Sequence, residues 1–359
     1  MMKRTALLFA VILLTNSRLI AQSPDYKSRI NAINQNINRI FYEPATGLYR
    51  ETNGKDDKPH SYLWPLCALM QAANETEQME PKKEYLKPVL AAIQQYYSTE
   101  PPAPGYQAYV SKESKDSRFY DDNQWIAIAA LDAYNRTGKK SYLILAEEIY
   151  RFMMTGFDEK SGGGLYWKED EKNTKNTCSN GPGILVALQL YKITKKKEYL
   201  TVATQLYDWT NKHLRAPDGI YWDAIKIPSM KIDSVKYTYN TGTMLQSNVY
   251  LYEITGKEEY LEEARVIADS ATNYFLKDGK FRDAYWFNAV LLRGYQHLYQ
   301  HTKNTKHLKA FKAALDNALA TRRDSRNLMV KDKAEDLVAQ AGMLEILARF
   351  AYMEEQGIL

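Results

Sequence analysis

The segment Leu251-Tyr252-Glu253-Ile254-Thr255-Gly256, followed by Tyr260-Leu261, decides the fold because close copies of it recur along the chain. The copies begin at Ala133, Leu190 and Leu298, and their tyrosines stand at 134, 191, 252 and 299, at intervals of 57, 61 and 47 residues. In each copy we expect a helix to end near Leu-Tyr, a Thr-Gly or Thr-Lys turn to follow, and Tyr-Leu to open the next helix. Such a period predicts a repeat of helical hairpins.

Outward from this repeat, the chain divides into twelve predicted helices of two alternating kinds. The leading helix of each pair is amphipathic and charged, as at 257–264, whereas the following helix is poorer in charge, as at 126–131. A helix that is apolar around most of its circumference is buried, and an amphipathic one lies outside. We therefore predict an all-α fold, an (α/α)6 toroid of six inner and six outer helices. The outer helices are expected at 25–41, 84–97, 140–155, 197–213, 257–275 and 304–321, and the inner helices at 61–73, 122–135, 181–192, 241–254, 285–300 and 334–353.

The rest of the chain adds little to this plan. No window shows sustained strand alternation, although short hairpins are expected near 164–167 and 219–222. No Pro- or Ser-rich linker divides the sequence, so residues 22–359 are predicted to form a single domain.

The N-terminus has the features of a cleavable signal peptide. Lys3 and Arg4 precede an apolar run from Ala6 to Leu14, which is too short to span a membrane, and Leu19-Ile20-Ala21 offers a cleavage site. We expect residues 1–21 to be removed and the protein to be secreted or periplasmic. No cysteine lies near the predicted cleavage site, so we expect no lipid anchor. No later apolar run is long enough to cross a bilayer.

Charge and cysteine content exclude several classes of function. The net charge of +5 includes three basic residues of the signal peptide, so the mature chain is near neutral, with scattered lysines. We therefore expect no nucleic-acid or membrane partner. Cys67 and Cys178 are expected to be two separate buried thiols. The five histidines form no spaced cluster with Cys or carboxylates, so no metal and no cofactor are expected.

The loops that precede the inner helices are expected to meet at one end of the toroid, and Asp121-Asp122 is their sharpest feature. Hydrolysis of a glycoside with retention needs a nucleophilic carboxylate and an acid/base about 5–5.5 Å apart. Neighbouring residues at a helix start can direct two carboxylates into one cleft. An Asp before a helix is also the usual N-cap, so the pair alone is a weak signal.

Four segments from Tyr120 to Leu261 resemble glycoside hydrolase family 76, the endo-α-1,6-mannanases. The segments are 120–125 (YDDNQW), 162–167 (GGGLYW), 176–181 (NTCSNG) and 239–242 (YNTG). The resemblance implies an (α/α)6 fold, a retaining mechanism, and Asp121 as nucleophile with Asp122 as acid/base. It also implies an α-mannan polysaccharide or oligosaccharide as substrate, and we expect a monomer. The likeness thins after Trp286, where 287–289 (FNA) replaces the aromatic-Lys-Gly stretch frequent in the family.

Other loop residues are candidates for sugar binding. They are Asn123, Gly163, Gly164, Trp167, Asn180, Tyr239, Asn240, Trp286 and His60. Trp167 is the best stacking platform, whereas Trp125 is expected to support the aspartates from the core. The glycines equally fit a hairpin turn, Asn180 and Asn240 stand at expected N-caps, and His60 fits either the cleft or the surface.

Three other functions remain open at this stage. An unsaturated glucuronyl hydrolase shares the scaffold, but its anionic substrate would favour Arg or Lys, which are few on these loops. A non-catalytic glycan-binding protein would need the aromatic residues but not the paired acids. A transglycosylase would pass through the same covalent intermediate, so the sequence does not separate it from a hydrolase.

Overall fold

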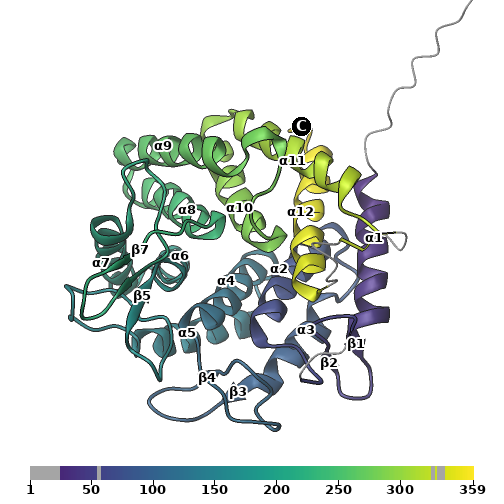
Figure 1. Ribbon diagram of the computed structural model, residues 1–359, viewed down its shortest axis with the longest axis horizontal. Helices are drawn as coiled ribbons and strands as arrows, with labels where there is room; N and C mark the ends of the chain where they lie inside the picture. Colours follow the sequence, from purple (N-terminus) through teal and green to yellow (C-terminus); the bar gives the residue numbers. More distant parts are fainter. Residues whose placement is uncertain (1–24, 55–57, 325–327, 330–335) are drawn as a thin grey trace, which may run out of the picture.

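The computed structural model describes residues 25–54, 58–324, 328–329 and 336–359. Figure 1 shows a ring of helices around a central axis. The predicted signal peptide at 1–21 lies outside the described residues, as does the first part of the inner helix expected at 334–353.

Six helices form the inner ring, and each packs against the next until the last contacts the first (Figure 1). The inner helices are α2 (Leu63–Met79), α4 (Tyr120–Thr137), α6 (Thr177–Thr194), α8 (Thr238–Thr255), α10 (Tyr285–Thr302) and α12 (Leu337–Glu355). Their buried faces are rich in Ala, Leu and Ile and form the main hydrophobic core. This arrangement confirms the predicted (α/α)6 toroid.

Six outer helices cover this ring. They are α1 (Tyr26–Asn36), α3 (Leu86–Ile93), α5 (Lys140–Met154), α7 (Lys197–Leu214), α9 (Glu258–Phe275) and α11 (Lys306–Thr321). Five of them pack on the inner helix that precedes them, and α1 packs on α12, so the two ends of the chain close the ring. Among the described residues, no helix combines the length and apolar character needed to cross a membrane.

The repeated Leu-Tyr…Thr-Gly segment is a helix terminator. The residue after each Thr adopts a left-handed conformation, with φ of 70° at Gly138, 61° at Lys195, 70° at Gly256 and 54° at Lys303. Its N–H bonds the carbonyl of the repeat tyrosine four residues earlier, at 2.8–2.9 Å. This geometry satisfies a carbonyl that the helix end would leave unpaired, which explains why the segment recurs at each hairpin.

Short strands lie in the loops that lead into the inner helices. Two two-stranded pairs join β1 (Tyr42–Glu43) to β2 (Leu48–Tyr49) and β3 (Tyr97–Ser98) to β4 (Gly105–Tyr106). A three-stranded antiparallel sheet has the order β5 (Thr174–Asn176), β6 (Ala224–Lys226) and β7 (Ile232–Asp233). Both predicted hairpins are present as isolated bridges, Phe157 with Leu165 and Arg215 with Tyr221. These loops build one end of the toroid.

Candidate active site

Asp121 and Asp122 lie in the first turn of the inner helix α4. The helix begins at Tyr120, and its N-cap is Phe119, which has no capping side chain. The two carboxylates are therefore the second and third residues of the helix and do not cap it. The free N–H groups and the dipole at this end favour negative charge there.

The loop before α4 pairs with the loop that carries Trp167. Phe119 and Lys168 form an antiparallel bridge, and the Tyr120 N–H bonds the Trp167 carbonyl at 3.0 Å. This backbone register brings the Trp167 side chain beside Asp121, although the two residues are 46 positions apart. The Trp167 indole Nε1–H then donates to Oδ2 of Asp121 at 3.2 Å.

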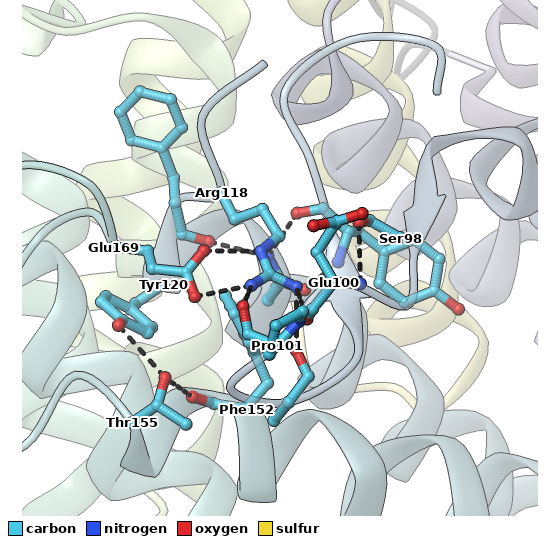
Figure 2. Close-up of polar contacts among 12 residues, drawn as sticks. Ser98, Glu100, Pro101, Arg118, Tyr120, Phe152, Thr155 and Glu169 are labelled. Carbon is cyan, nitrogen blue, oxygen red and sulfur yellow. Dashed lines mark hydrogen bonds and ion pairs between the residues drawn. The ribbon is translucent and has the colours of Figure 1, made fainter. Parts of the chain in front are cut away.

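Arg118 stabilises this pairing through the polar contacts that Figure 2 shows. Its guanidinium forms a fork with the Glu169 carboxylate, at 2.6 Å from Nε and 2.5 Å from Nη2. The other bonds go to three carbonyls of the β3–β4 loop, those of Glu100, Pro101 and Ala103. Arg118 is only 5% exposed. Such a saturated buried guanidinium holds three loops in register three residues before Asp121.

A cavity of about 440 Å³ opens above the two aspartates. Its lining is mainly aromatic and acidic: Tyr62, Trp64, Ala108, Asp116, Phe119, Asp121, Asp122, Trp125, Trp167, Tyr239, Trp286 and Phe287. None of these described lining residues is Lys or Arg. Flat apolar rings beside carboxylates suit a neutral sugar, whose C–H face stacks on aromatic side chains.

The two carboxylates have different electrostatic surroundings. Burial raises the pKa of Asp121, while hydrogen bonds from the Cys178 thiol and the Trp167 indole lower it. Burial and the negative charge of Asp121 together hold the pKa of Asp122 well above its usual range. No side chain of the described residues donates a hydrogen bond to the Asp122 carboxylate. The surroundings of Asp121 therefore favour its anion more than the surroundings of Asp122 do.

The two cysteines flank this pair from neighbouring inner helices. Both thiols are buried and unpaired, as predicted. Cys67 Sγ lies 3.3 Å from the Asp122 carbonyl oxygen. Burial raises the pKa of the Cys178 thiol well above its usual range, so the thiol stays protonated and can donate to Asp121. The sequence offered no signal for this role beyond the family-like 176–181 segment.

Two predicted sugar ligands, Asn123 and Asn180, instead hydrogen-bond an inner helix to the loop that precedes it. Asn123 is fully buried, and its amide bonds both backbone groups of Tyr106, at 2.7 and 2.8 Å. Asn180 is buried too and bonds both backbone groups of Leu165, at 2.8 and 3.0 Å. Each is the fourth residue of its inner helix. The same position holds Asn288 in α10 and Gln340 in α12, which also bond backbone groups of the preceding loop.

The prediction that Asn180 and Asn240 cap their helices is wrong. The helices begin earlier than expected, at Thr177 and Thr238, so both residues lie inside the first turn. Asn240 is fully buried and donates to Oδ1 of Asp223 at 3.0 Å. Burial nevertheless raises the pKa of the Asp223 carboxyl. Asp223 follows the second predicted hairpin, and no motif in the sequence marks it as a site residue.

Comparison with known proteins places this site in a family. The sequence profile of glycosyl hydrolase family 76 matches residues 25–285. The chain belongs to this family. The match contains all four segments that carried the resemblance and extends from α1 to the start of α10.

Curated relatives of this family 76 chain include two proteins of Saccharomyces cerevisiae. Mannan endo-1,6-alpha-mannosidase DCW1 is 28% identical over 187 residues, which cover 48% of this chain and 41% of DCW1. Mannan endo-1,6-alpha-mannosidase DFG5 is 31% identical over 155 residues, which cover 39% of this chain and 33% of DFG5. The chain thus spans less than half the length of these relatives.

Solved structures of family 76 share the fold over most of this chain. An α-mannanase from Bacteroides thetaiotaomicron has a TM-score of 0.86 at 25% identity, covering 92% of this chain and 97% of that one. An α-1,6-mannanase from Salegentibacter sp. HEL1_6 has a TM-score of 0.78 at 22% identity, covering 92% and 100%. The latter is an inactive variant with two adjacent aspartates replaced by asparagine, in complex with α-1,6-mannotriose.

The glycine-rich loop of this family 76 chain has a packing role. Gly163 and Gly164 have φ of 113° and 85°, which L side chains rarely adopt. A Cβ on Gly164 would lie 2.6 Å from the Trp209 ring. Neither glycine lines the cavity above the aspartates. Of the two interpretations left open, the structure favours the turn.

His60 lies neither in the cleft nor on the surface. It is 8% exposed, with Nδ1 2.7 Å from Glu113 and Nε2 3.4 Å from Glu43. By contrast, Trp167, Tyr239 and Trp286 all line the cavity. Trp167 is 37% exposed and is therefore the ring most open to a ligand.

Several residues that line the cavity were not among the predicted site residues. Phe287 packs against Tyr239 with ring centroids 4.2 Å apart and ring planes tilted by 37°, and Tyr62 and Trp64 form another part of the wall. The sequence could have indicated these cavity residues, because each of them stands next to or within the first turn of an inner helix. Trp125 is 4% exposed and packs edge-on to Trp286 at 5.5 Å, and it also lines the cavity.

The expectation that the histidines form no cluster with carboxylates is wrong. Glu253, His297 and His301 have ligand atoms within 4.8 Å of one another. The sequence indicates two members of this cluster, because His297 and His301 are four residues apart on one helix. Glu253 comes from a different helix, α8, and only the packing of α8 on α10 brings it there.

Proposed function

We propose that this protein is a retaining glycoside hydrolase that cleaves α-1,6-mannosidic linkages in mannan. The observation that carries the proposal is the pair Asp121-Asp122 in the first turn of α4, beneath an aromatic cavity without Lys or Arg among its described lining residues. Family membership supports the reaction class. The names of the relatives support the linkage.

In this proposal Asp121 is the nucleophile. Its carboxylate accepts hydrogen bonds from the Trp167 indole and from the Asp122 N–H, at 3.2 and 3.1 Å. These donors and the helix terminus favour the anion, which attacks the anomeric carbon and forms a glycosyl ester. The leaving sugar oxygen departs from the anomeric carbon at the same time and needs a proton.

Asp122 is the acid/base in the same proposal. Burial and the adjacent charge keep it protonated near neutral pH, so it can supply that proton. Once it has given up the proton, its carboxylate can take one from the water that attacks the ester. The product then keeps its anomeric configuration.

The residues that line the cavity also argue against two of the competing functions. A glucuronyl substrate would place a carboxylate beside Asp116, Asp121 and Asp122 with no cation among the described lining residues, which Coulomb repulsion disfavours. A binding protein would gain nothing from two buried carboxylates of raised pKa. A neutral α-mannan chain fits the lining best.

We also propose export of the protein, as the N-terminal sequence predicts. Secretion or periplasmic location would bring the enzyme to a polysaccharide substrate outside the cytoplasm. Sequencing the N-terminus of the exported protein tests this proposal. A mature chain that begins near residue 22 supports it, and an uncleaved cytosolic chain contradicts it.

Digestion of linear α-1,6-mannan tests the enzymatic proposal. Wild-type protein should release short oligosaccharides, whose first-formed reducing ends should be the α anomer by proton NMR. Asp121→Ala should release none above background. Release of the β anomer would show that the reaction inverts the anomeric configuration and does not retain it. If wild-type protein released no oligosaccharides from mannan of defined linkage, α-1,6-mannan would be excluded as the substrate.

The same digestion can separate hydrolysis from transglycosylation. A competing mannose acceptor is added in excess, and the products are resolved by mass. Hydrolysis should remain the main outcome, because the cavity is partly open to water. Transfer of most of the glycosyl groups to the acceptor would instead identify a transglycosylase.

A further inference from the structure

The end of the toroid opposite Asp121 contains a second cavity. The inner helices share one direction, so the C-terminal ends of these helices meet there. The cavity has a volume of about 750 Å³, and Glu253 and His297 line it. Both residues come from the last two turns of their helices, α8 and α10. The catalytic proposal above makes no use of this end.

Three side chains converge where Glu253 and His297 line this cavity. Nε2 of His297 lies 2.9 Å from Oε1 of Glu253, and Nε2 of His301 lies 2.8 Å from the same oxygen. All three ligand atoms lie within 4.8 Å of one another. The two histidines are four residues apart, so successive turns of α10 present them on the same face.

The structure assigns a binding site for a divalent transition-metal ion of the zinc class to Glu253, His297 and His301. Two imidazole nitrogens and one carboxylate oxygen are ligands of the kind that Zn²⁺ accepts, with water in the fourth position. Imidazole also suits Cu²⁺ and Ni²⁺, whereas Ca²⁺ and Mg²⁺ prefer oxygen ligands. The bound ion would tie α8 to α10.

The spacing of the three atoms is close to what a metal requires. Zn–N and Zn–O bonds of about 2.0–2.2 Å in a tetrahedron place neighbouring ligand atoms about 3.3–3.5 Å apart. The two contacts to Glu253 at 2.9 and 2.8 Å therefore need to lengthen by only about half an ångström. The two histidine nitrogens also lie within 4.8 Å of each other, which is at most about 1.5 Å beyond this spacing.

The surroundings suit this role. Lys192 Nζ lies 2.5 Å from Oε2 of Glu253, so it orients the carboxylate while Oε1 remains directed at the histidines. Such support of a ligand by a neighbouring group is usual at metal sites. The His301 side chain is 26% exposed, which gives an ion and its water ligand a route in.

A titration of the untagged full chain with zinc chloride, after chelation with EDTA and removal of the chelator, tests the assignment. We expect one Zn²⁺ per chain by calorimetry and a midpoint of thermal unfolding that rises with zinc concentration. His301→Gln is the decisive variant, because its amide can still donate to Glu253 but cannot replace the imidazole as a ligand. It should weaken binding at least about 100-fold.

His213→Gln is the matched control, since His213 lies on α7 outside the cluster and should leave zinc binding unchanged. His297→Ala is a second variant. Because the loss of its buried ring can lower stability, this variant is judged only by the number of zinc ions bound per chain. The assignment is overturned by wild-type protein that binds no zinc, or by His301→Gln protein that binds it as tightly as wild type. An equal loss in His213→Gln would also overturn it.

Discussion

The indole Nε1–H of Trp167 donates a hydrogen bond to Oδ2 of Asp121 at 3.2 Å, across 46 positions of sequence. The bond exists because 118–120 and 167–169 pair as antiparallel backbone, with Arg118 and Glu169 locking the register. A residue expected only as a stacking platform for a sugar therefore also contacts the proposed nucleophile.

Trp167→Phe should move the acid limb of the kcat/KM profile to higher pH. The indole bond lowers the pKa of Asp121, so its loss raises that pKa, and the anionic nucleophile then forms only at higher pH. A bond to a charged group corresponds to about one pKa unit, and exposure of the ring reduces this shift to about half a unit. Trp222→Phe, in the other hairpin and outside the cavity lining, is the control. An unchanged acid limb in Trp167→Phe would show that the bond does not tune Asp121.

Asp122→Ala should slow cleavage of poor leaving groups most. An activated aryl α-mannoside needs little protonation, so its glycosylation step should survive, and azide should restore turnover by replacing the lost base. Asp121→Ala should abolish turnover of every α-mannoside. The measurement is the rate with and without azide, with NMR of the products. A glycosyl azide of inverted configuration from Asp121→Ala would exchange the two roles, and full activity of either variant would exclude the pair.

Arg118→Met should destabilise the fold by about 3–5 kcal/mol, because it leaves the Glu169 carboxylate and three carbonyls without their buried partner. Chemical denaturation measures this loss. Arg265→Met is the comparison, since its ion pair with Glu262 is exposed and should contribute at most about 1 kcal/mol. Equal losses in the two variants would refute the anchoring role of Arg118.

Asn180→Ala should lower stability rather than sugar affinity. The buried amide pairs both backbone groups of Leu165, and leaving them unpaired should cost about 2–4 kcal/mol. Asn135→Ala, on the exposed face of α4, should change the free energy of unfolding by less than about 0.5 kcal/mol. The two readouts are denaturation and KM for a mannooligosaccharide. A raised KM at unchanged stability would restore Asn180 as a sugar ligand.

The twelve-helix plan and the position of the aspartate pair could be predicted from the amino-acid sequence alone. The repeat could be read because helix termination is local: the N–H of Gly256 bonds the Tyr252 carbonyl four residues earlier, and a left-handed residue is needed there. The placing of Asp121 and Asp122 at an inner-helix start followed from the same local periodicity. Burial is the main cause of the raised pKa of Asp122, and the sequence shows the second cause, the negative charge of the adjacent Asp121.

Which loop residues face the cavity depends on how the helices and loops pack in three dimensions. Asn123 and Asn180 look like ligands in sequence, but an amide four residues into an inner helix can reach the backbone of the preceding loop, and that bond buries it. Trp167 reaches Asp121, and Glu253 reaches His297, across elements whose packing no local pattern encodes. Side chains on different helices meet according to helix rotation and loop register, and these depend on the closure of the whole ring.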